Sequence, residues 1–514
     1  MTATLIAENT ALWVLLAFQI AMGGFDVIVH HEITERLAWK PNAGQELALH
    51  AARNALYAVL FGGLAWLRPT GLAAGALIAI LLIEIVITLW DFVEEDQTRK
   101  LPPTERVLHT LMAINYGAIC ACALPFLWAW AHEATGLAVV NYGLGTAVLS
   151  AAGVGCLGFA ARDFYTSRRA ATLYEPPLPR LGALLPGRRC ILVTGATGFI
   201  GARLTASLTA AGHEVIALVR SPARAGSLTA PVTLVTSLDQ IPANAAVDAV
   251  VHLAGEPVAN WPWTKRQRYR IARSRLKIAR DIGIWIKSRP AALRPAVVVT
   301  ASAIGFYGER GEESLSEADG TGKGFAARSC AAVERRAASY RALGVRAASL
   351  RIGLVLSVWG GPLARMIPAF DLGLGGPMGH GSQWMSWIGR DDLVRLIAHT
   401  ISCLDLDGAV NATAPGPVRN AAFAASLGKA LHRPVFLRVP DFVLRYGLGE
   451  MGTSLLLGSA RVMPAKALAS GFSFETPALE DMLRSELGRM AGARANTLAA
   501  PPRAALAMGE RRSL

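Results

Sequence analysis

The chain has 514 residues, of which 53% are hydrophobic and only 17% are charged. A soluble globular protein usually carries about 25% charged residues, so this composition argues against an ordinary soluble protein and indicates membrane content. The formal net charge of +14 fits either a nucleic-acid binder or a protein with basic loops beside membrane helices. Because many of the basic residues flank long apolar runs, we prefer the membrane interpretation and expect no nucleic-acid partner.

The apolar excess is concentrated before about residue 161, in runs of about 17–25 residues, which is the length that crosses a bilayer as a helix. These runs are Thr10–Val29, Ala51–Leu67, Leu72–Trp90, Val107–Ala131 and Leu137–Ala161. We therefore predict an all-α transmembrane helix bundle of about five spans over residues 1–165.

Basic residues are shared unequally between the two sets of loops. The segments after the first, third and fifth runs contain Arg36, Lys40, Arg99, Lys100, Arg106, Arg162, Arg168, Arg169, Arg180, Arg188 and Arg189, whereas the opposite loops contain only Arg68. Because basic loops stay on the cytoplasmic side, the N-terminus is expected outside and the C-terminal domain in the cytoplasm. The expected location is the inner, cytoplasmic membrane, as a multi-pass protein.

Ionisable residues recur inside the apolar runs at helical spacing. Asp26 and His30 are four residues apart, as are Glu105 and His109, so each pair shares a helix face. Ionisable groups at membrane depth are costly, which makes a function the default hypothesis. A metal site is one interpretation, with candidate ligands His30, His50, Asp91, Glu95, Glu105 and His109. A buried network of salt bridges that stabilises the bundle is the other.

The rest of the chain divides by composition. Residues 166–189 contain Pro176, Pro177, Pro179 and Pro186 with five arginines, which predicts a semi-rigid linker. We predict an NADP-binding Rossmann domain over residues 190–425 and a small C-terminal substrate-side domain over 426–487. Residues 488–514 are rich in Ala, Arg and Pro and predict a disordered basic tail.

A glycine motif begins the second half. Cys190–Thr194 is a run of strand formers, followed by the turn Gly195-Ala196-Thr197-Gly198-Phe199-Ile200-Gly201 and then by a helical pattern and a second strand. Strand, glycine turn, helix and strand within about 30 residues form a dinucleotide-binding unit. The first glycine permits the turn, the second lets the backbone approach the pyrophosphate, and the third lets the helix pack on the strand. The helix N-terminus then attracts the phosphates.

The end of the second strand selects the cofactor. NAD-binding proteins place an acidic residue there for the ribose hydroxyls, whereas this strand ends at Val219-Arg220-Ser221. Arg220 can hold a 2′-phosphate, so NADP(H) is favoured over NAD(H). A solvated loop arginine is the alternative. Farther along, Leu253, Ala254 and Gly255 follow another strand and let the cofactor pass over its end.

These segments identify a family. Residues 190–490 resemble the atypical extended short-chain dehydrogenase group, a sugar-nucleotide epimerase-like family with a C-terminal domain of unknown function. The resemblance rests on the glycine turn, His252–Pro257, Ser302–Gly308, Arg351–Leu356, Leu372–Pro377, Gln383–Ile388 and the segment from His432 to Pro464. It covers about three-fifths of the chain and implies an α/β Rossmann fold, a doubly wound parallel sheet with a small C-terminal lobe.

The resemblance also directs attention to the reaction centre. Typical short-chain dehydrogenases use a Tyr-x-x-x-Lys pair, and the corresponding window, residues 324–334, contains neither residue. Cys330 falls near the lysine position. Gly389 and Val333 stand where relatives usually have His and Trp. The candidate catalytic residues are Ser302, Tyr307 and Cys330, with a packing role as the alternative for Tyr307.

The sequence therefore predicts a membrane-anchored NADP(H)-binding oxidoreductase or epimerase-like protein. Its expected partners are the membrane and a small-molecule or lipid-linked substrate with a carbonyl or hydroxyl group. Two alternatives stay open: a catalytically silent NADP(H)-binding regulatory module, and redox coupling from NADPH to a metal in the membrane bundle.

Overall fold

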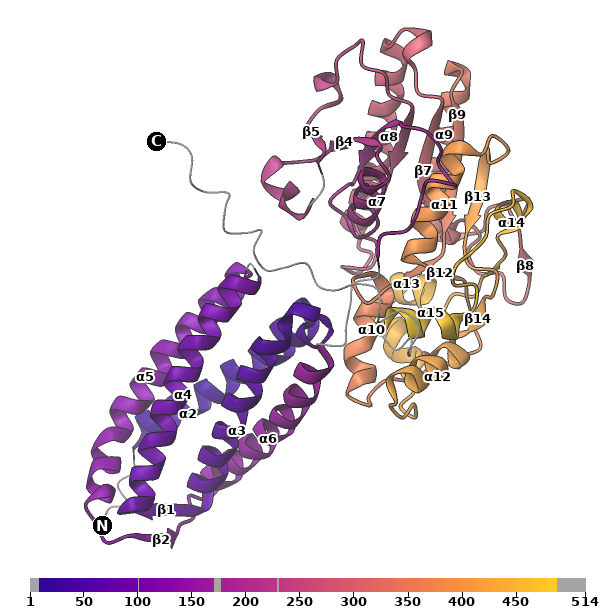
Figure 1. The fold of residues 1–514 in the computed structure, drawn as a ribbon. Coiled ribbons are helices and arrows are strands. Elements are labelled where there is room, and N and C mark those ends of the chain that lie inside the picture. Colours follow the sequence, from indigo (N-terminus) through magenta and orange to yellow (C-terminus); the bar gives the residue numbers. More distant parts are fainter. Residues whose placement is uncertain (1–8, 100, 171–176, 229–230, 488–514) are drawn as a thin grey trace, which may run out of the picture. The chain divides into compact units, whose positions relative to one another are not determined.

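The computed structural model describes residues 9–99, 101–170, 177–228 and 231–487. Contacts between residues divide the chain into two compact units, residues 1–175 and 176–514 (Figure 1). The tail expected to be disordered, 488–514, and part of the expected linker, 171–176, lie outside the described residues.

Long helices make up the N-terminal unit. They are α2 (Thr10–Phe25), which continues as the π-helix η1 (Asp26–Glu35), α3 (Gly44–Trp66), α4 (Leu72–Thr98), α5 (Pro103–Ala131) and α6 (Leu144–Ala170). Within the described residues, five helices are long and apolar enough to cross a membrane by length and composition. A short antiparallel pair, β1 (Leu67–Thr70) and β2 (Gly136–Val139), connects them at one end.

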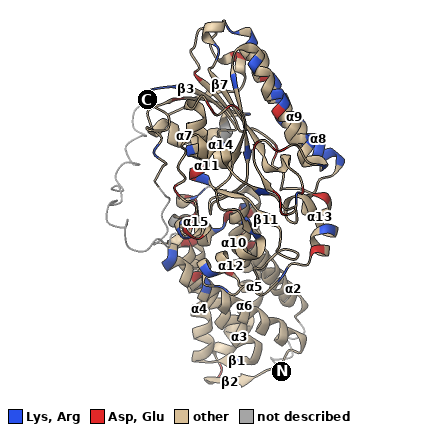
Figure 2. Ribbon diagram, turned by 90° about the vertical axis from the view of Figure 1, so that its right-hand side faces the viewer, with Lys and Arg blue, Asp and Glu red and all other residues tan. Residues whose placement is uncertain are grey.

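The surface of this unit is apolar and its interior is partly polar. Val86, Trp128 and Val154 are 63%, 65% and 72% exposed, whereas Asp26 and Glu105 are buried. In Figure 2 the helices of this unit are mostly tan, while Lys and Arg gather along α8 (Lys265–Ser288) of the other unit. An apolar exterior around buried charges reverses the pattern of a soluble domain and is the arrangement that lipid favours.

The basic loops meet at one end of the bundle. Asn42 donates to the carbonyl oxygen of Thr98 at 3.1 Å, which ties the loop after η1 to the end of α4. Arg169 donates to the carbonyl oxygen of Ala38 at 2.8 Å and stacks over the ring of Trp39. These contacts keep α6 helical through Ala170, so the start of the linker expected at residue 166 is instead the last turn of a packed helix.

A seven-stranded sheet forms the centre of the C-terminal unit. Its order is β13-β9-β7-β6-β3-β4-β5, and every pair is parallel. The strands are β3 (Cys190–Thr194), β4 (Glu214–Leu218), β5 (Thr233–Val235), β6 (Ala249–His252), β7 (Val297–Ala303), β9 (Arg346–Ile352) and β13 (Gly408–Ala412). From β3 the chain adds β4 and β5 on one side and then β6, β7, β9 and β13 on the other. Strands added outward from a central pair in this way form a doubly wound sheet, which confirms the predicted Rossmann fold.

Helices cover both faces of the sheet. Ile191 and Val193 of β3 point into a core shared with α7 (Phe199–Ala210) and α11 (Arg390–Ser402). Leu192, between them, points into a second core shared with α8 and α9 (Gly324–Ala338). A strand whose two sides are both buried needs apolar residues at every position. The covered faces therefore explain why Cys190–Thr194 is a continuous apolar run.

The remaining elements form a smaller lobe beside the carboxyl ends of the strands. Its helices are α10 (Gly361–Asp371), α12 (Asn420–Leu431), α13 (Asp441–Leu455), α14 (Ala465–Ala469) and α15 (Leu479–Glu486). Short strand pairs connect them, β10 (Leu354–Leu356) with β12 (Trp387–Gly389), β11 (Trp384–Met385) with β14 (Val418–Arg419), and β8 (Ser314–Leu315) with β15 (Arg461–Val462). Residues Leu181 and Leu185 of the expected linker are buried in the sheet's core.

Candidate cofactor and active site

The glycine turn after β3 has the geometry that a dinucleotide requires. Gly195 has φ +76°, a conformation that side chains disfavour, and a Cβ there would lie 2.8 Å from the backbone nitrogen of Ala254. A Cβ on Gly201 would lie 2.1 Å from the carbonyl oxygen of Gly195, so only glycine lets α7 approach this closely. The turn is therefore fixed by contact of backbone with backbone.

Gly198 stands at the start of α7, where no side chain caps the helix. The first amide groups of a helix have no partners inside it, and they carry the positive end of the helix dipole. Thr197 and Gly198 are exposed, while Phe199 and Ile200 are half-buried. The predicted phosphate-binding residues thus form an open helix N-terminus, the standard site for a pyrophosphate.

Arg220 follows β4 and is exposed. Its side chain has no ion pair with a carboxylate in the part of the chain that the structure describes. The sequence from Val219 to Leu228 contains no Asp or Glu. A guanidinium without an acidic neighbour at this strand end fits a phosphate on the adenosine ribose rather than free ribose hydroxyls.

The end of β6 supplies the neighbouring wall. His252 is buried, and its Nδ1 lies 2.8 Å from the hydroxyl of Thr194, which joins the two central strands. Burial lowers the pKa of His252 to about 4, so the ring is neutral at physiological pH. Beyond it, a Cβ on Gly255 would meet the guanidinium of Arg275 at 2.9 Å. The expected cofactor-contacting residues Leu253, Ala254 and Gly255 therefore lie between a rigid strand end and an arginine of α8.

Arg275 lies on α8 with its guanidinium against Gly255. It donates to the carbonyl oxygen of Ile271 at 3.0 Å and forms no ion pair with a carboxylate among the described residues. Burial lowers the pKa of this guanidinium. A half-buried arginine that faces a glycine rather than a carboxylate is suited to an anionic ligand.

Ser302 and Cys330 come together from β7 and α9. The hydroxyl of Ser302 donates to Oε1 of Glu334 at 2.7 Å. Burial raises the pKa of the Cys330 thiol, against the opposing effect of hydrogen bonds with Ser302 and the backbone of Ala303. Cys330 is therefore a neutral thiol, which does not suit it to act as a nucleophile.

Tyr307 is fully buried and belongs to the hydrophobic cluster against which Cys330 packs. Its hydroxyl accepts from Nη1 of Arg351 at 2.8 Å and lies 2.7 Å from Oδ1 of Asn411 and 2.8 Å from the carbonyl oxygen of Ser316. Arg351 in turn donates to both oxygens of Glu334. This network occupies the hydroxyl and favours the packing role for Tyr307 over proton donation.

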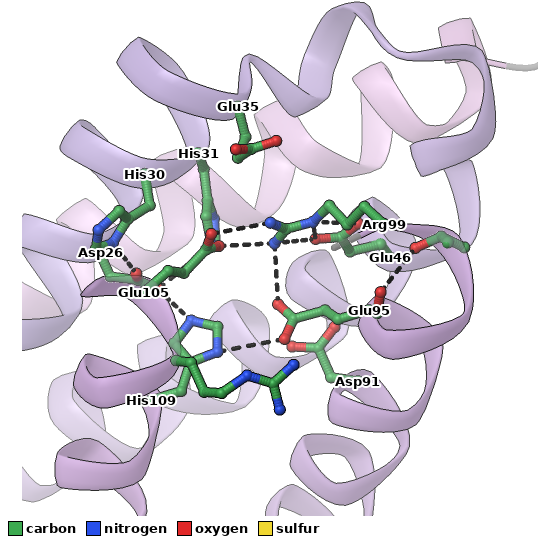
Figure 3. Close-up of polar contacts among 12 residues, drawn as sticks. Asp26, His30, His31, Glu35, Glu46, Asp91, Glu95, Arg99, Glu105 and His109 are labelled. Atoms are coloured by element: carbon green, nitrogen blue, oxygen red, sulfur yellow. Dashed lines mark hydrogen bonds and ion pairs between the residues drawn. The ribbon is translucent and has the colours of Figure 1, made fainter. Parts of the chain in front are cut away.

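The predicted metal ligands lie in the other unit (Figure 3). Glu105 and His109 converge with Asp26 and His31, and a second group brings together His31, His50 and Glu95. His30 lies outside both groups and contacts Asp26 and Thr104. Asp91 is also outside them, paired with Arg53 at 2.9 Å and close to His50 at 3.1 Å. His31, which the sequence reasoning missed, is common to both groups.

Comparison with known proteins agrees with the fold and the turn. Residues 191–411 match the model of the NAD dependent epimerase/dehydratase family, and residues 439–486 match a domain of unknown function, DUF1731. The chloroplastic SDR39U1 homologue of Arabidopsis thaliana is 38% identical over 300 residues, 57% of this chain and 86% of that protein. Human SDR39U1 is 33% identical over 300 residues, 57% of this chain and 98% of that protein.

A solved structure extends this likeness. The crystal structure of human epimerase family protein SDR39U1 with NADPH matches with a TM-score of 0.52 and 29% identity, over 58% of this chain and 99% of that one. The fold and the glycine turn define a NAD(P)-binding protein of the short-chain dehydrogenase type. Within that class, the chain belongs to the epimerase family that includes SDR39U1. The family models match only from residue 191 onward, which leaves the helical unit outside them.

Proposed function

We propose that the C-terminal unit binds NADP(H) in preference to NAD(H) and transfers hydride to or from a carbonyl or hydroxyl carbon. The observation that carries the proposal is Arg220, exposed beside the glycine turn at a strand end without any carboxylate. NADPH in the crystal of the human relative supports the same preference. When bound, the cofactor supplies the hydride, and the protein's part is to hold it and to exclude competing reactions.

The residues near the reaction centre suggest how the protein contributes. Arg275, which has no ion pair with a carboxylate among the described residues, stabilises negative charge on the substrate. Ser302 is oriented by Glu334 and presents a hydroxyl beside the neutral thiol of Cys330. Because the Tyr-x-x-x-Lys pair is absent, Ser302 and Cys330 are the groups that can exchange a proton with the substrate oxygen.

The N-terminal unit, in this proposal, anchors the enzyme in the cytoplasmic membrane. Its apolar exterior and the convergence of basic loops at one end support this placement, and the positive-inside rule puts that end in the cytoplasm. The end of α6 that leads into the C-terminal unit lies at the same basic end. An anchored enzyme suits a lipid-linked or otherwise amphipathic substrate, which a soluble enzyme would reach less readily.

Deuteride transfer tests the reaction. The full-length protein in detergent is incubated with NADPH deuterated at the nicotinamide C4 and with lipid extract or a panel of carbonyl compounds. The proposal expects deuterium in a product, and slower transfer with Ser302→Ala than with the exposed control Ser339→Ala. Tight NADPH binding without deuterium transfer to any compound would contradict an enzymatic role and favour the regulatory module.

The membrane placement has its own test. Fusions of alkaline phosphatase to the N-terminus and of green fluorescent protein to the C-terminus report which side each end occupies. We expect phosphatase activity from the first and fluorescence from the second, with the protein retained in membranes after alkaline carbonate washing. Release of the protein by carbonate, or the opposite pattern of fusions, would overturn the proposed anchoring.

A further inference from the structure

The N-terminal unit contains a dense group of buried charges. Its described carboxylates with less than a tenth of their surface exposed are Asp26, Glu32, Glu46, Glu84, Asp91, Glu95, Glu105 and Asp163. Three arginines pair with this group, Arg53, Arg99 and Arg162. These carboxylates outnumber the three guanidinium groups, and a buried charge is costly unless it is compensated. Protonated histidines or a bound cation can provide that compensation.

The atoms at the centre converge on one point. Oδ2 of Asp26 lies 3.3 Å from Nε2 of His31 and 3.1 Å from Nε2 of His109. The Nε2 atom of His31 is 3.8 Å from Oε1 of Glu105. One ligand atom from each of these four residues lies within 4.8 Å of all the others. Two adjacent ligands of one ion with bonds of about 2.1 Å are separated by about 3.0–3.4 Å. The distances from Asp26 to His31 and to His109 lie in this range, and Glu105 lies slightly farther from His31.

Hydrogen bonding distinguishes between the two kinds of compensation. Nε2 of His31, which faces the four-residue centre, is buried and has no hydrogen-bond partner among the described residues. The same holds for Nε2 of His50, which faces Asp91, and for Nδ1 of His109, which faces Glu95, whereas Nε2 of His109 bonds to Asp26. The side chains of these three residues are only 7%, 2% and 8% exposed. A protonated imidazole would direct each N–H at an oxygen, and the oxygens 3.1–3.3 Å away are not aligned for this. Nε2 of His31 is therefore the unpartnered nitrogen at the four-residue centre, and a neutral imidazole nitrogen of this kind can hold a metal ion.

Asp26 and His31 both belong to η1, whose geometry brings them together. From Asp26 to Glu35 the chain is a π-helix, in which residues five apart share a face. Asp26 and His31 therefore point to the same centre, which an α-helix would not allow. Extra residues of this kind cost stability and are found most often at functional sites.

The surrounding residues hold the carboxylates in place. Arg99 donates to Glu105 at 2.7 and 2.9 Å and also to Glu46 and Glu95 (Figure 3). Hydrogen bonds to the carboxylates are the usual outer support of a metal site. The ring of His31 also stacks on that of His50 at 4.6 Å, which places the second group, His31, His50 and Glu95, directly beside the first.

We propose that Asp26, His31, Glu105 and His109 bind a divalent transition-metal ion within the helical unit. Imidazole and carboxylate together favour iron, manganese or zinc over magnesium or calcium, which prefer oxygen ligands alone. Carboxylates and histidines from facing helices are also the ligand set by which helical bundles hold metals. The site is independent of NADP(H) binding, because all its ligands belong to the N-terminal unit.

Metal content of the full-length protein tests the proposal. The protein is purified in detergent through a tag without histidine and without chelator, and its metals are measured by mass spectrometry. It is then stripped with chelator and titrated with Co²⁺, whose visible absorption reports its ligands. The proposal expects about one iron, manganese or zinc ion per chain, and Co²⁺ bands after stripping. No stoichiometric metal as isolated, together with no Co²⁺ bands, would overturn it.

Two adjacent histidines provide matched variants. His31→Gln should lower the affinity for Co²⁺ by at least about 100-fold. His30→Gln, which alters hydrogen bonds to Asp26 and Thr104, should keep the stoichiometry and lose at most about tenfold. Equal effects of the two variants would contradict the assignment. Circular dichroism and elution volume identify a variant that fails to fold. His31→Cys then decides the question, since a sulfur ligand adds a charge-transfer band to the cobalt spectrum and a merely structural residue adds none.

Discussion

The carboxylate of Asp26 contacts two successive histidines of its own helix, with Oδ1 2.8 Å from Nδ1 of His30 and Oδ2 3.3 Å from Nε2 of His31. The π-helix that begins at Asp26 makes this contact with both the fourth and the fifth following residue. One carboxylate thereby fixes two imidazoles and also reaches His109 on α5. Asp26 consequently links η1 to α5 through buried contacts.

Replacement of Asp26 should therefore destabilise the helical unit strongly. Asp26→Ala removes a carboxylate that contacts three imidazoles, and loss of one partner of a buried charged group costs about 3–5 kcal/mol. We expect a clearly lower midpoint of thermal unfolding in detergent, with a smaller loss for Asp26→Asn. Asp96→Ala is the control, since its ion pair with Arg106 is exposed on both sides. Equal midpoints for Asp26→Ala and Asp96→Ala would contradict the prediction.

The glycine turn should not tolerate a methyl group at its third glycine. In Gly201→Ala the new Cβ would lie 2.1 Å from the carbonyl oxygen of Gly195, so α7 must move away from the turn. We expect NADPH affinity to fall by more than about tenfold and stability by about 1–3 kcal/mol, as for overpacked cores. NADPH fluorescence and thermal unfolding measure the two effects. Gly182→Ala, where a Cβ meets nothing within 4 Å, should change neither.

His252 should make stability depend on mildly acidic pH. Its pKa is lowered from 6.5 to about 4 by burial, so the folded protein favours the neutral ring. The resulting stability is fully present above pH 6.5 and is lost as the pH falls toward 4, by roughly 3 kcal/mol for this shift. Thermal unfolding from pH 4 to 8 should show a smaller slope in His252→Gln than in the wild type. Parallel curves over that range would contradict the account.

Variants of Tyr307 and Ser302 should have different effects, the first on stability and the second on hydride transfer. Tyr307→Phe removes the acceptor of Arg351 and the partner of Asn411, so it should cost about 1–3 kcal/mol of stability while NADPH affinity stays unchanged. Ser302→Ala should affect hydride transfer more than stability. Loss of transfer in Tyr307→Phe, with the unfolding midpoint unaltered, would return Tyr307 to the role of proton donor.

The parts that the sequence predicted well are those encoded locally. The strand, turn and helix around Gly195 and Gly201 follow from consecutive residues, and so does the absence of an acidic residue near Arg220. These features depend on backbone geometry that a short stretch of sequence determines. The doubly wound parallel sheet was implied by the resemblance of several such segments to a known family, and its strand order came from the structure.

The parts that it missed depend on contacts between distant segments. His31 was missed because α-helical spacing of four residues from Asp26 selects His30. The sequence contains no signal that predicts a π-helix at Asp26. Arg99 comes after the third apolar run and was assigned only to a basic loop, yet it pairs with Glu46, Glu95 and Glu105. Tyr307 was a candidate proton donor until its contacts with Arg351 and Asn411 appeared. Only the folded chain brings these groups together.

The central claim, that this protein is an NADP(H)-binding member of its family, depends most directly on Arg220. Titration of NADPH and NADH into the wild type, Arg220→Ala and the exposed control Arg188→Ala gives the dissociation constants. We predict tighter binding of NADPH than of NADH, a loss of about 10–100-fold for NADPH alone in Arg220→Ala, and no change in Arg188→Ala. Equal affinity for the two cofactors in the wild type, unaltered in Arg220→Ala, would contradict the account.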